Sequence, residues 1–314
     1  MKLKTIKWAF FICLFAAVCY INLRYEIFAL NTFDQRGTEE TFRVMTYNVN
    51  APLGNEDIDA LRLGLIDKIN HHRPDILCLQ ELSSANFGKI KNTLDSLFHY
   101  NDSLEIKKQT LRYLLYSKLP IRNFNYHPCL NEIDTTDLDS ATQREVKIYK
   151  RQLPFYSAEI EVKPSKWVKV FSCHLRSSAY STARRSMDED ASWRDGLPVY
   201  YENYKIGQKI RNWEADNFRQ YLEALEEDDT PVIIAGDFND WSGSYCMNII
   251  RGEKYKDAWW EGGVGFGITY DGWHLKLRLD HILYSHHFKL ENVYVEKSKF
   301  SDHRPLIADF SLLP

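Results

Sequence analysis

The chain has 314 residues, of which 44% are hydrophobic, 14% aromatic and 26% charged. This composition can bury a substantial core and excludes wholesale disorder. The formal net charge of -3 and the pI near 6.4 give no general attraction to phosphate backbones, so they disfavour a non-specific nuclease.

A basic N-terminus precedes an apolar segment. Lysines within the first seven residues are followed by an uncharged stretch from Trp8 to Leu23. The stretch is short of the ~20 residues of a perpendicular membrane span, but the flanking Lys7 and Arg24 can extend to the headgroups. We predict that residues 1–25 form a membrane anchor. A cleaved signal segment is the main alternative, although Ala17-Val18-Cys19 is a poor cleavage site, and a buried core helix is the third.

The predicted anchor sets the expected location of the rest of the chain. Because its lysines lie on the N-terminal side, we expect the N-terminus in the cytoplasm and the large domain outside it, either anchored or exported. We expect residues 26–40 to be a polar tether and residues 41–314 to form one domain, since polar motifs between Asn48 and His303 must meet.

The six cysteines give little evidence on whether the domain lies outside the cytoplasm. Cys78 and Cys173 lie within predicted strands and are expected to be small buried hydrophobic residues. Cys129 and Cys246 could form a disulfide if the domain is exported. No cysteine spacing predicts a zinc site or a redox motif.

Strand and helix patterns along the chain predict an α/β fold. Residues 42–47 form a predicted strand, and Asn55 can cap a helix whose apolar face includes Leu61 and Leu65. Pro74 ends this helix before a strand at residues 75–79. Further strands are predicted at residues 113–116, 155–162, 167–173, 232–236, 279–284 and 306–310.

The predicted long helix and the loops surround these strands. An amphipathic pattern predicts a helix at residues 204–225. Residues 176–201 are rich in polar and charged side chains and are predicted to be a long surface loop after His174. Residues 262–272 contain several glycines and are predicted to be a second, flexible loop.

Five short clusters place carboxylate, amide or imidazole groups at the ends of apolar runs. They are Tyr47-Asn48-Val49-Asn50, Leu79-Gln80-Glu81, Gly236-Asp237-Phe238-Asn239, Leu279-Asp280-His281 and Ser301-Asp302-His303-Arg304-Pro305. An apolar run such as residues 232–235 is typical of a buried strand, so the polar groups after it should converge at one rim of a sheet. Oxygen ligands at such a rim can bind a hard cation.

Taken in order, these clusters resemble the endonuclease/exonuclease/phosphatase superfamily of DNase I-like phosphohydrolases. The resemblance runs from about Phe42 to Phe310. It implies a four-layer α/β/β/α sandwich of two mixed sheets with helices outside. It also implies hydrolysis of a phosphoester by water with a divalent cation, Mg²⁺ or alternatively Mn²⁺.

The resemblance assigns Glu81, Asn48 and Asp302 to the metal, with Asp302 either a ligand itself or in contact with the ligands. Alone, a glutamate at a strand end is more often a cap or a surface charge. Residues 74–81 match the context of the family's metal-binding glutamate. Magnesium prefers a few carboxylate and amide oxygens and keeps several waters, which fits this set better than a histidine cage.

The remaining catalytic assignments also come from the resemblance. Asp237 and Asn239 stand two apart and share one side of an extended chain, although an Asp/Asn turn is the simpler interpretation. The resemblance makes Asp237 the residue that activates water, and Asn239 and His174 the residues that hold phosphate.

An aspartate and a histidine complete the predicted site. Asp280 can fix the tautomer of His303 and raise its pKa, so that a charged imidazole stabilises the transition state. Arg304 is expected to form a structural ion pair. His281 is left out, since it points to the opposite side of its strand from Asp280.

The chain departs from the family pattern at several positions. Asn50 stands where AP endonuclease-like members carry an aspartate, which argues against a second carboxylate-rich metal site. Phe238 replaces the leucine of inositol polyphosphate phosphatases, and residues 278–281 replace their Trp-Cys-Asp-Arg run. No residue is a secure match for the tyrosine that supports phosphate in AP endonuclease-like enzymes.

The expected function is therefore a phosphodiesterase of the nuclease type acting outside the cytoplasm. Its substrate is expected to be nucleic acid or, alternatively, a phospholipid headgroup, as in sphingomyelinases. A catalytically inactive, membrane-anchored binding module is the remaining alternative. No protein partner is predicted.

Overall fold

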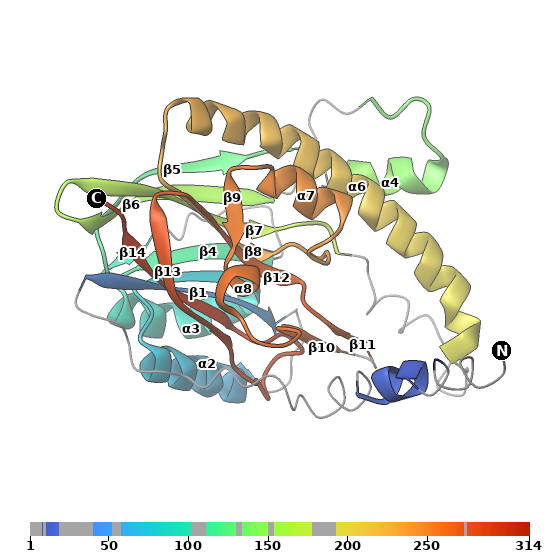
Figure 1. Ribbon diagram of the computed structural model, residues 1–314, viewed down its shortest axis with the longest axis horizontal. Coiled ribbons are helices and arrows are strands. Elements are labelled where there is room, and N and C mark those ends of the chain that lie inside the picture. The colour runs from blue at the N-terminus through green and yellow to red at the C-terminus, as the bar shows by residue number, and fades with distance from the viewer. Residues whose placement is uncertain are drawn as a thin grey trace.

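Two six-stranded mixed sheets pack face to face, and helices cover their outer sides (Figure 1). The computed structural model describes residues 8, 11–18, 40–51, 58–101, 111–129, 134–149, 154–177, 193–272 and 275–314. This arrangement confirms the predicted α/β fold of two mixed sheets.

The first sheet has the strand order β13-β14-β1-β2-β4-β3. Its strands are β1 (Thr41–Ala51), β2 (Ile76–Ser83), β3 (Tyr100–Asn101), β4 (Leu111–Ser117), β13 (Phe288–Val295) and β14 (Leu306–Leu312). Strands β1 and β2 are parallel, whereas β14 pairs antiparallel with β1. The C-terminal ends of β1 and β2 therefore lie at the same edge of the sheet.

The second sheet has the order β5-β6-β7-β8-β12-β9. Its strands are β5 (Ile121–His127), β6 (Phe155–Lys163), β7 (Lys166–His174), β8 (Val232–Asp237), β9 (Tyr255–Asp257) and β12 (Asp280–Ser285). Strands β7 and β8 are parallel, so their C-terminal ends also share one edge. A separate two-stranded sheet pairs β10 (Tyr270–Gly272) with β11 (Leu275–Leu277).

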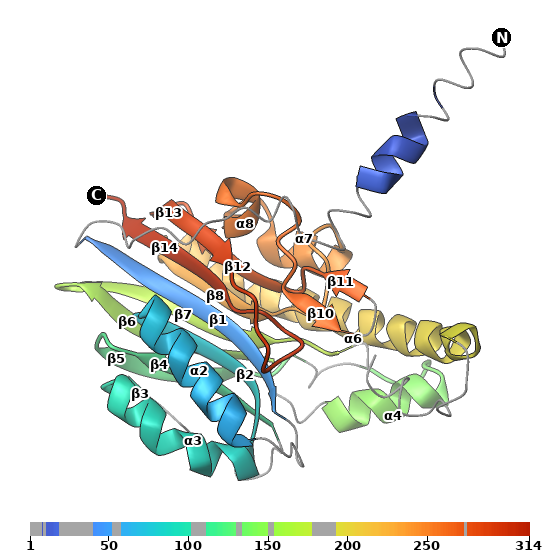
Figure 2. The ribbon, with the colours of Figure 1, turned by 90° about the horizontal axis from the view of Figure 1, so that it is seen from below.

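Helices cover both outer faces. The helices are α2 (Ile58–His72), α3 (Ser84–Leu97), α4 (Ser140–Tyr149), α6 (Trp193–Glu227), α7 (Tyr245–Arg251) and α8 (Ala258–Gly262). Apolar side chains of α2 and α3 pack on the first sheet, and those of α6 and α7 pack on the second. Helix α4 lies beside α6 (Figure 2).

A third apolar core fills the space between the sheets. It includes Val44 and Ile76 from the first sheet and Val170 and Ile233 from the second, all fully buried. Burying one such side chain contributes about 1.5–3 kcal/mol. These contacts fix the two sheets against each other.

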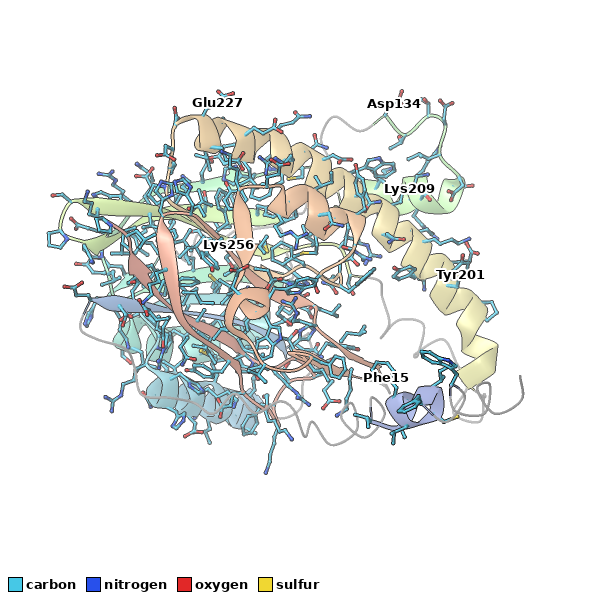
Figure 3. The ribbon with its side chains drawn as sticks, viewed as in Figure 1. Phe15, Asp134, Tyr201, Lys209, Glu227 and Lys256 are labelled. Atoms are coloured by element: carbon cyan, nitrogen blue, oxygen red, sulfur yellow. The ribbon has the colours of Figure 1, made fainter. Side chains whose placement is uncertain are left out.

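Two loop predictions need correction. The long helix begins at Trp193, so the predicted loop at residues 176–201 is wrong from residue 193 onward. Figure 3 shows Tyr201 and Lys209 along the same helix. Pro198 lies in its second turn. Proline has no backbone N–H and is disfavoured within helices, so its presence favours a loop when only the sequence is considered. The predicted loop at residues 262–272 instead ends in strand β10.

The N-terminal prediction falls largely outside the described residues. Residues 11–18 are helical and exposed. Within the described part of the chain, no helix combines the length and apolarity that a membrane span requires. Most of the predicted anchor at residues 1–25 and of the tether at residues 26–40 is not described. Cys129 and Cys246 are both free and buried.

Gly236 allows strands β7 and β8 to approach closely. A Cβ atom at this position would lie 2.0 Å from the carbonyl oxygen of Cys173. Any larger residue must therefore displace the backbone beside His174 and Asp237.

We predict that Gly236→Ala lowers the free energy of unfolding by about 1–3 kcal/mol, because the added methyl group overlaps backbone atoms. Gly88→Ala is the matched control. A Cβ at exposed Gly88 meets nothing within 4 Å, and alanine favours the helix by about 0.5–1 kcal/mol. Urea denaturation measures both, and equal effects of the two substitutions would contradict the prediction.

Candidate active site

The ends of strands from both sheets bring the predicted residues together. In the second sheet, His174 lies opposite Asp237 across β7 and β8, and Asp237 lies opposite Asp280 across β8 and β12. In the first sheet, Asn48 lies near the end of β1 and Glu81 near the end of β2. Hydrogen bonds and ion pairs connect the two groups.

Irregular backbone geometry sets the direction of several of these side chains. The pairing of β1 with β2 shifts register between Asn48 and Ala51, and that of β2 with β4 shifts between Leu79 and Leu82. Asn50 and Glu81 adopt positive φ angles of 40° and 59°. Such bulges bend a strand and turn a side chain out of its alternating position.

Asp237 is the centre of the site and is fully buried. Its Oδ2 accepts a hydrogen bond from Asn48 Nδ2 at 2.9 Å, and its Oδ1 accepts one from the backbone N–H of Asn239 at 2.7 Å. The Nε2 atoms of His174 and His303 lie 3.6 and 3.8 Å from Oδ2.

The environment raises the proton affinity of Asp237. Burial raises the pKa of this carboxyl group and outweighs the charge of His303, which lowers it, while the neighbouring Asp280 raises it further. A carboxylate with a raised pKa is a better general base.

Glu81 remains ionised in the same cluster. Its Oε1 accepts a hydrogen bond from Asn48 Nδ2 at 3.0 Å and lies 3.3 Å from His174 Nε2. Burial opposes ionisation, but the hydrogen bond and charge of His174 outweigh it and lower the pKa of Glu81 to about 2. The site therefore holds a fixed negative charge at neutral pH.

His303 and Asp280 form the predicted pair. The distance from His303 Nδ1 to Asp280 Oδ2 is 2.8 Å. Burial lowers the pKa of His303, but Asp280 and Asp237 outweigh this effect and raise it to about 10. The imidazole is therefore positively charged at neutral pH, and its ring lies against Tyr270 with centroids 5.0 Å apart.

Asp302 lies beside this pair and is held by Asn50. Asn50 Nδ2 donates to Asp302 Oδ1 at 2.7 Å, and Ser301 Oγ donates to the backbone oxygen of Asn48 at 2.8 Å. Burial raises the pKa of Asp302, and the negative charge of Glu81 adds to the rise. Proximity of two carboxyl groups is the electrostatic setting in which a cation is stabilising.

The residues present fit a divalent metal ion. Of the predicted carboxylate ligands, Glu81 shares a group of ligand atoms within 4.8 Å of one another with His174 and Asp237, whereas Asp302 belongs to no such group among the described residues. Asn48 has a different task in this geometry, since its Nδ2 donates to both carboxylates and its Oδ1 accepts from the Asn50 N–H. Its role as a metal ligand stays a prediction.

Two residues that the sequence analysis kept apart from catalysis have structural partners. The His281 ring is buried between Asp257 Oδ2 and the backbone oxygen of Asp240, at 3.1 and 3.0 Å. Arg304 pairs with Asp271, as predicted. Neither side chain is a hydrogen-bond or ion-pair partner of Asp237.

The sequence analysis missed three supporting residues. Asn50 marks only a departure from the family pattern in the sequence, although it binds Asp302, and Ser301 carries no predicted role, although it links the segment between β13 and β14 to β1. Both lie within the motifs themselves, so their position was the available signal. Tyr270 bridges to His303 from β10, and no sequence motif marks it.

Replacing Asp280 by asparagine should return the pKa of His303 from about 10 toward the ordinary histidine value of about 6.5, because the largest stabilising charge is lost. NMR titration of histidine rings measures this change. Asp67→Asn, at an exposed position on α2, should leave the His303 pKa unaltered.

The same pair predicts a pH dependence of stability. A histidine whose pKa is higher in the folded state stabilises the protein below pH ~6.5 and loses this contribution as the pH rises through its folded value. The deficit of Asp280→Asn in unfolding free energy should therefore be largest near pH 6 and shrink toward about pH 10. A deficit independent of pH would contradict the assigned charge on His303.

Known structures resemble this fold at low sequence identity. The human Nocturnin catalytic domain with bound sulfate is 18% identical, with a TM-score of 0.59, covering 89% of this chain and 96% of that one. A humanised TDP2 from D. rerio is 17% identical, with a TM-score of 0.58 and coverage of 87% and 100%. An endonuclease/exonuclease/phosphatase from Bacteroides vulgatus is 16% identical, with a TM-score of 0.60 and coverage of 87% and 99%.

No match was found among curated proteins. The model of the endonuclease/exonuclease/phosphatase family matches residues 45–303, which contain every residue of the site described above. The chain belongs to the endonuclease/exonuclease/phosphatase family.

Proposed function

We propose that this chain is a divalent-metal-dependent hydrolase of phosphoester bonds, using Mg²⁺ or alternatively Mn²⁺. The observation that carries the proposal is the contact of Asp237 with both His174 and His303, with Glu81 beside them. Phosphoester hydrolysis needs a base for water and positive charge around the phosphoryl oxygens. This cluster supplies both.

Asp237 and the residues around it divide the work at the phosphorus. Asp237 removes a proton from the attacking water, a role that suits its raised pKa. His174 and Asn239 hold the phosphate. Asn239 is held beside Asp237, since its Nδ2 donates to the Leu175 backbone oxygen at 3.0 Å and to Asp237 Oδ2 at 3.2 Å.

His303 and Asp280 stabilise the charge that develops in the transition state. The His303 imidazole is charged and held by Asp280 at 2.8 Å, so it needs no reorientation during the reaction. Removing one such preorganised donor typically costs ~10²–10³ in kcat.

Glu81, Asn48 and Asp302 are the residues that would hold the cation. When bound, it neutralises charge on the phosphate oxygens and orients the substrate. Glu81 is suited to this role, because it remains ionised at neutral pH. Asn50 keeps the Asp302 carboxylate in place.

A single-stranded nucleic acid is the favoured substrate, and a phospholipid headgroup is the alternative. A TDP2 structure from D. rerio contains a single-stranded DNA product. In this chain, Trp241 follows the phosphate-holding Asn239 by two residues and is 56% exposed, which suits stacking on a base. An inactive binding module is disfavoured, since every charged group needed for hydrolysis is present.

We propose further that the catalytic domain is anchored to a membrane and lies outside the cytoplasm. The support is the run of N-terminal lysines before the uncharged stretch from Trp8 to Leu23. In intact cells, protease added outside should cleave the domain, and carbonate washing should leave the chain with the membranes. Protection from external protease would contradict this location.

A substrate panel tests the proposed activity with the full chain in detergent. We expect hydrolysis of a chromogenic phosphodiester and of at least one of single-stranded DNA, RNA, sphingomyelin and phosphoinositides, abolished by chelator and restored by Mg²⁺. Asp237→Asn should lower kcat by at least ~10²-fold, because water loses its base. Asp67→Asn, an exposed carboxylate on α2, is the matched control.

Folding of each variant is checked by circular dichroism, so that loss of activity reports on chemistry. Wild-type activity in Asp237→Asn would refute the assigned base. Tight binding of a panel compound without turnover by the wild-type chain would support the binding module instead.

A further inference from the structure

A second cluster of metal-binding groups lies at the other end of the strands that carry the active site. Asp229 lies between α6 and β8, and His286 and His287 form the turn between β12 and β13. Strand β12 begins at Asp280 and ends at Ser285, so the cluster is roughly 17 Å from the active site. The two sites cannot share ligands.

The distances in this cluster match a tetrahedral site. Asp229 Oδ1 lies 3.6 Å from His286 Nε2 and 3.4 Å from His287 Nε2. Ligands about 2.0–2.1 Å from Zn²⁺ in a tetrahedron are about 3.3–3.4 Å apart. The two imidazole rings lie on the same side of the turn, with centroids 4.1 Å apart, whereas adjacent residues of a strand point to opposite faces.

His287 has the partner expected behind a metal-binding imidazole. Its Nδ1 lies 3.0 Å from Ser285 Oγ, which already accepts a hydrogen bond from the Val232 N–H at 3.0 Å. The remaining lone pair of this hydroxyl oxygen can accept the Nδ1 proton. The Nε2 lone pair then faces Asp229, and a fixed tautomer of this kind is common in metal sites.

Two further polar groups line the same small cavity. Glu226 and the Tyr255 hydroxyl are partners of each other, and both residues border the cavity with Asp229, His286 and His287. Tyr255 is only 3% exposed. Buried polar groups normally have a partner, often a water. Here each group is the partner of the other, and both give the cavity a polar wall.

We propose that Asp229, His286 and His287 bind a late first-row divalent cation such as Zn²⁺, with water as the fourth ligand. Two imidazole nitrogens and one carboxylate select such an ion over Mg²⁺. The ion joins the end of α6 to the turn between β12 and β13, and thus stabilises the ends of strands β8 and β12. This site is independent of the proposed hydrolysis.

A plain surface ion pair is the competing interpretation. Asp229 is 73% and His286 64% exposed in their side chains, and exposed pairs contribute little to stability. That interpretation gives no role to the contact that fixes the tautomer of His287. It also predicts no specific metal stoichiometry.

The test uses the full chain with Glu81→Gln and Asp237→Asn, which weaken metal binding at the active site. Titration with Co²⁺ should give the visible absorption of a tetrahedral ion at one equivalent. Zn²⁺ should displace Co²⁺ and raise the melting temperature by roughly 5 °C. Adding His286→Ala and His287→Ala should abolish both effects, whereas His99→Ala, at an exposed histidine on another surface, should abolish neither.

Asp229→Asn keeps the size of the side chain and serves as the second variant if the histidine pair disturbs folding. It should weaken Co²⁺ binding at least tenfold and change the visible spectrum. Equal Co²⁺ uptake by all these variants, or no uptake by the parent chain, would overturn the proposed site. Hydrolysis is measured separately in the chain with wild-type Glu81 and Asp237, where His286→Ala and His287→Ala should leave it unchanged.

Discussion

The buried carboxylate of Asp237 constrains more of this molecule than any other group. A buried charge is costly unless it is paired and hydrogen-bonded. Its partners come from both sheets, since Asn48 donates from β1 while His174 and Asn239 contact it from the second sheet. The packing between the sheets therefore has to bring the ends of β1 and β8 to the same place. The apolar core between the sheets stabilises their packing, and the contacts of Asp237 require that the ends of β1 and β8 meet.

The bulges near the ends of β1 and β2 turn side chains toward the site that a regular strand would direct elsewhere. In a regular strand successive side chains point to opposite faces, so adjacent residues cannot serve one site. Asn50 and Glu81 leave the regular conformation with positive φ values, as does Asn239 after β8. Such conformations cost about 1–3 kcal/mol each and persist where surrounding contacts impose them. Here the hydrogen bonds to Asp302, Asn48 and Asp237 impose them.

The sequence predicted best where the chain is most buried. Strand β8 is an uninterrupted apolar run that is buried along its whole length, so its pattern had one interpretation. Strand β5 is half-exposed, contains Asn123 with a positive φ of 53°, and was not predicted. Helix α3 was missed because its N-terminal residues directly continue β2 without a break in the chain.

Within the site too, the residues that the sequence predicted are those next to buried strands. His174 and Asp237 end the buried strands β7 and β8, and Asp280 begins the antiparallel β12 beside them, so their convergence follows from the strands alone. Tyr270 reaches His303 through a three-residue strand whose sequence has no periodicity to detect. The hydrogen bond from Asn50 to Asp302 depends on a bulge, and a bulge depends on tertiary contacts that sequence patterns do not record.

Charge pairs rather than apolar contacts position the loops that follow the phosphate-holding residues. Arg176, two residues after His174, pairs with Glu145 of α4, and its backbone oxygen accepts from Arg211 of α6 at 2.8 Å. Arg211 also pairs with Asp240, the residue after Asn239, at 3.2 Å. Buried ion pairs are weak sources of stability, but they fix orientation because misaligned charges are costly. Helix α6 therefore acts on the site through Arg211, which fixes the segments after β7 and β8 relative to each other. The apolar face of the same helix packs on the second sheet.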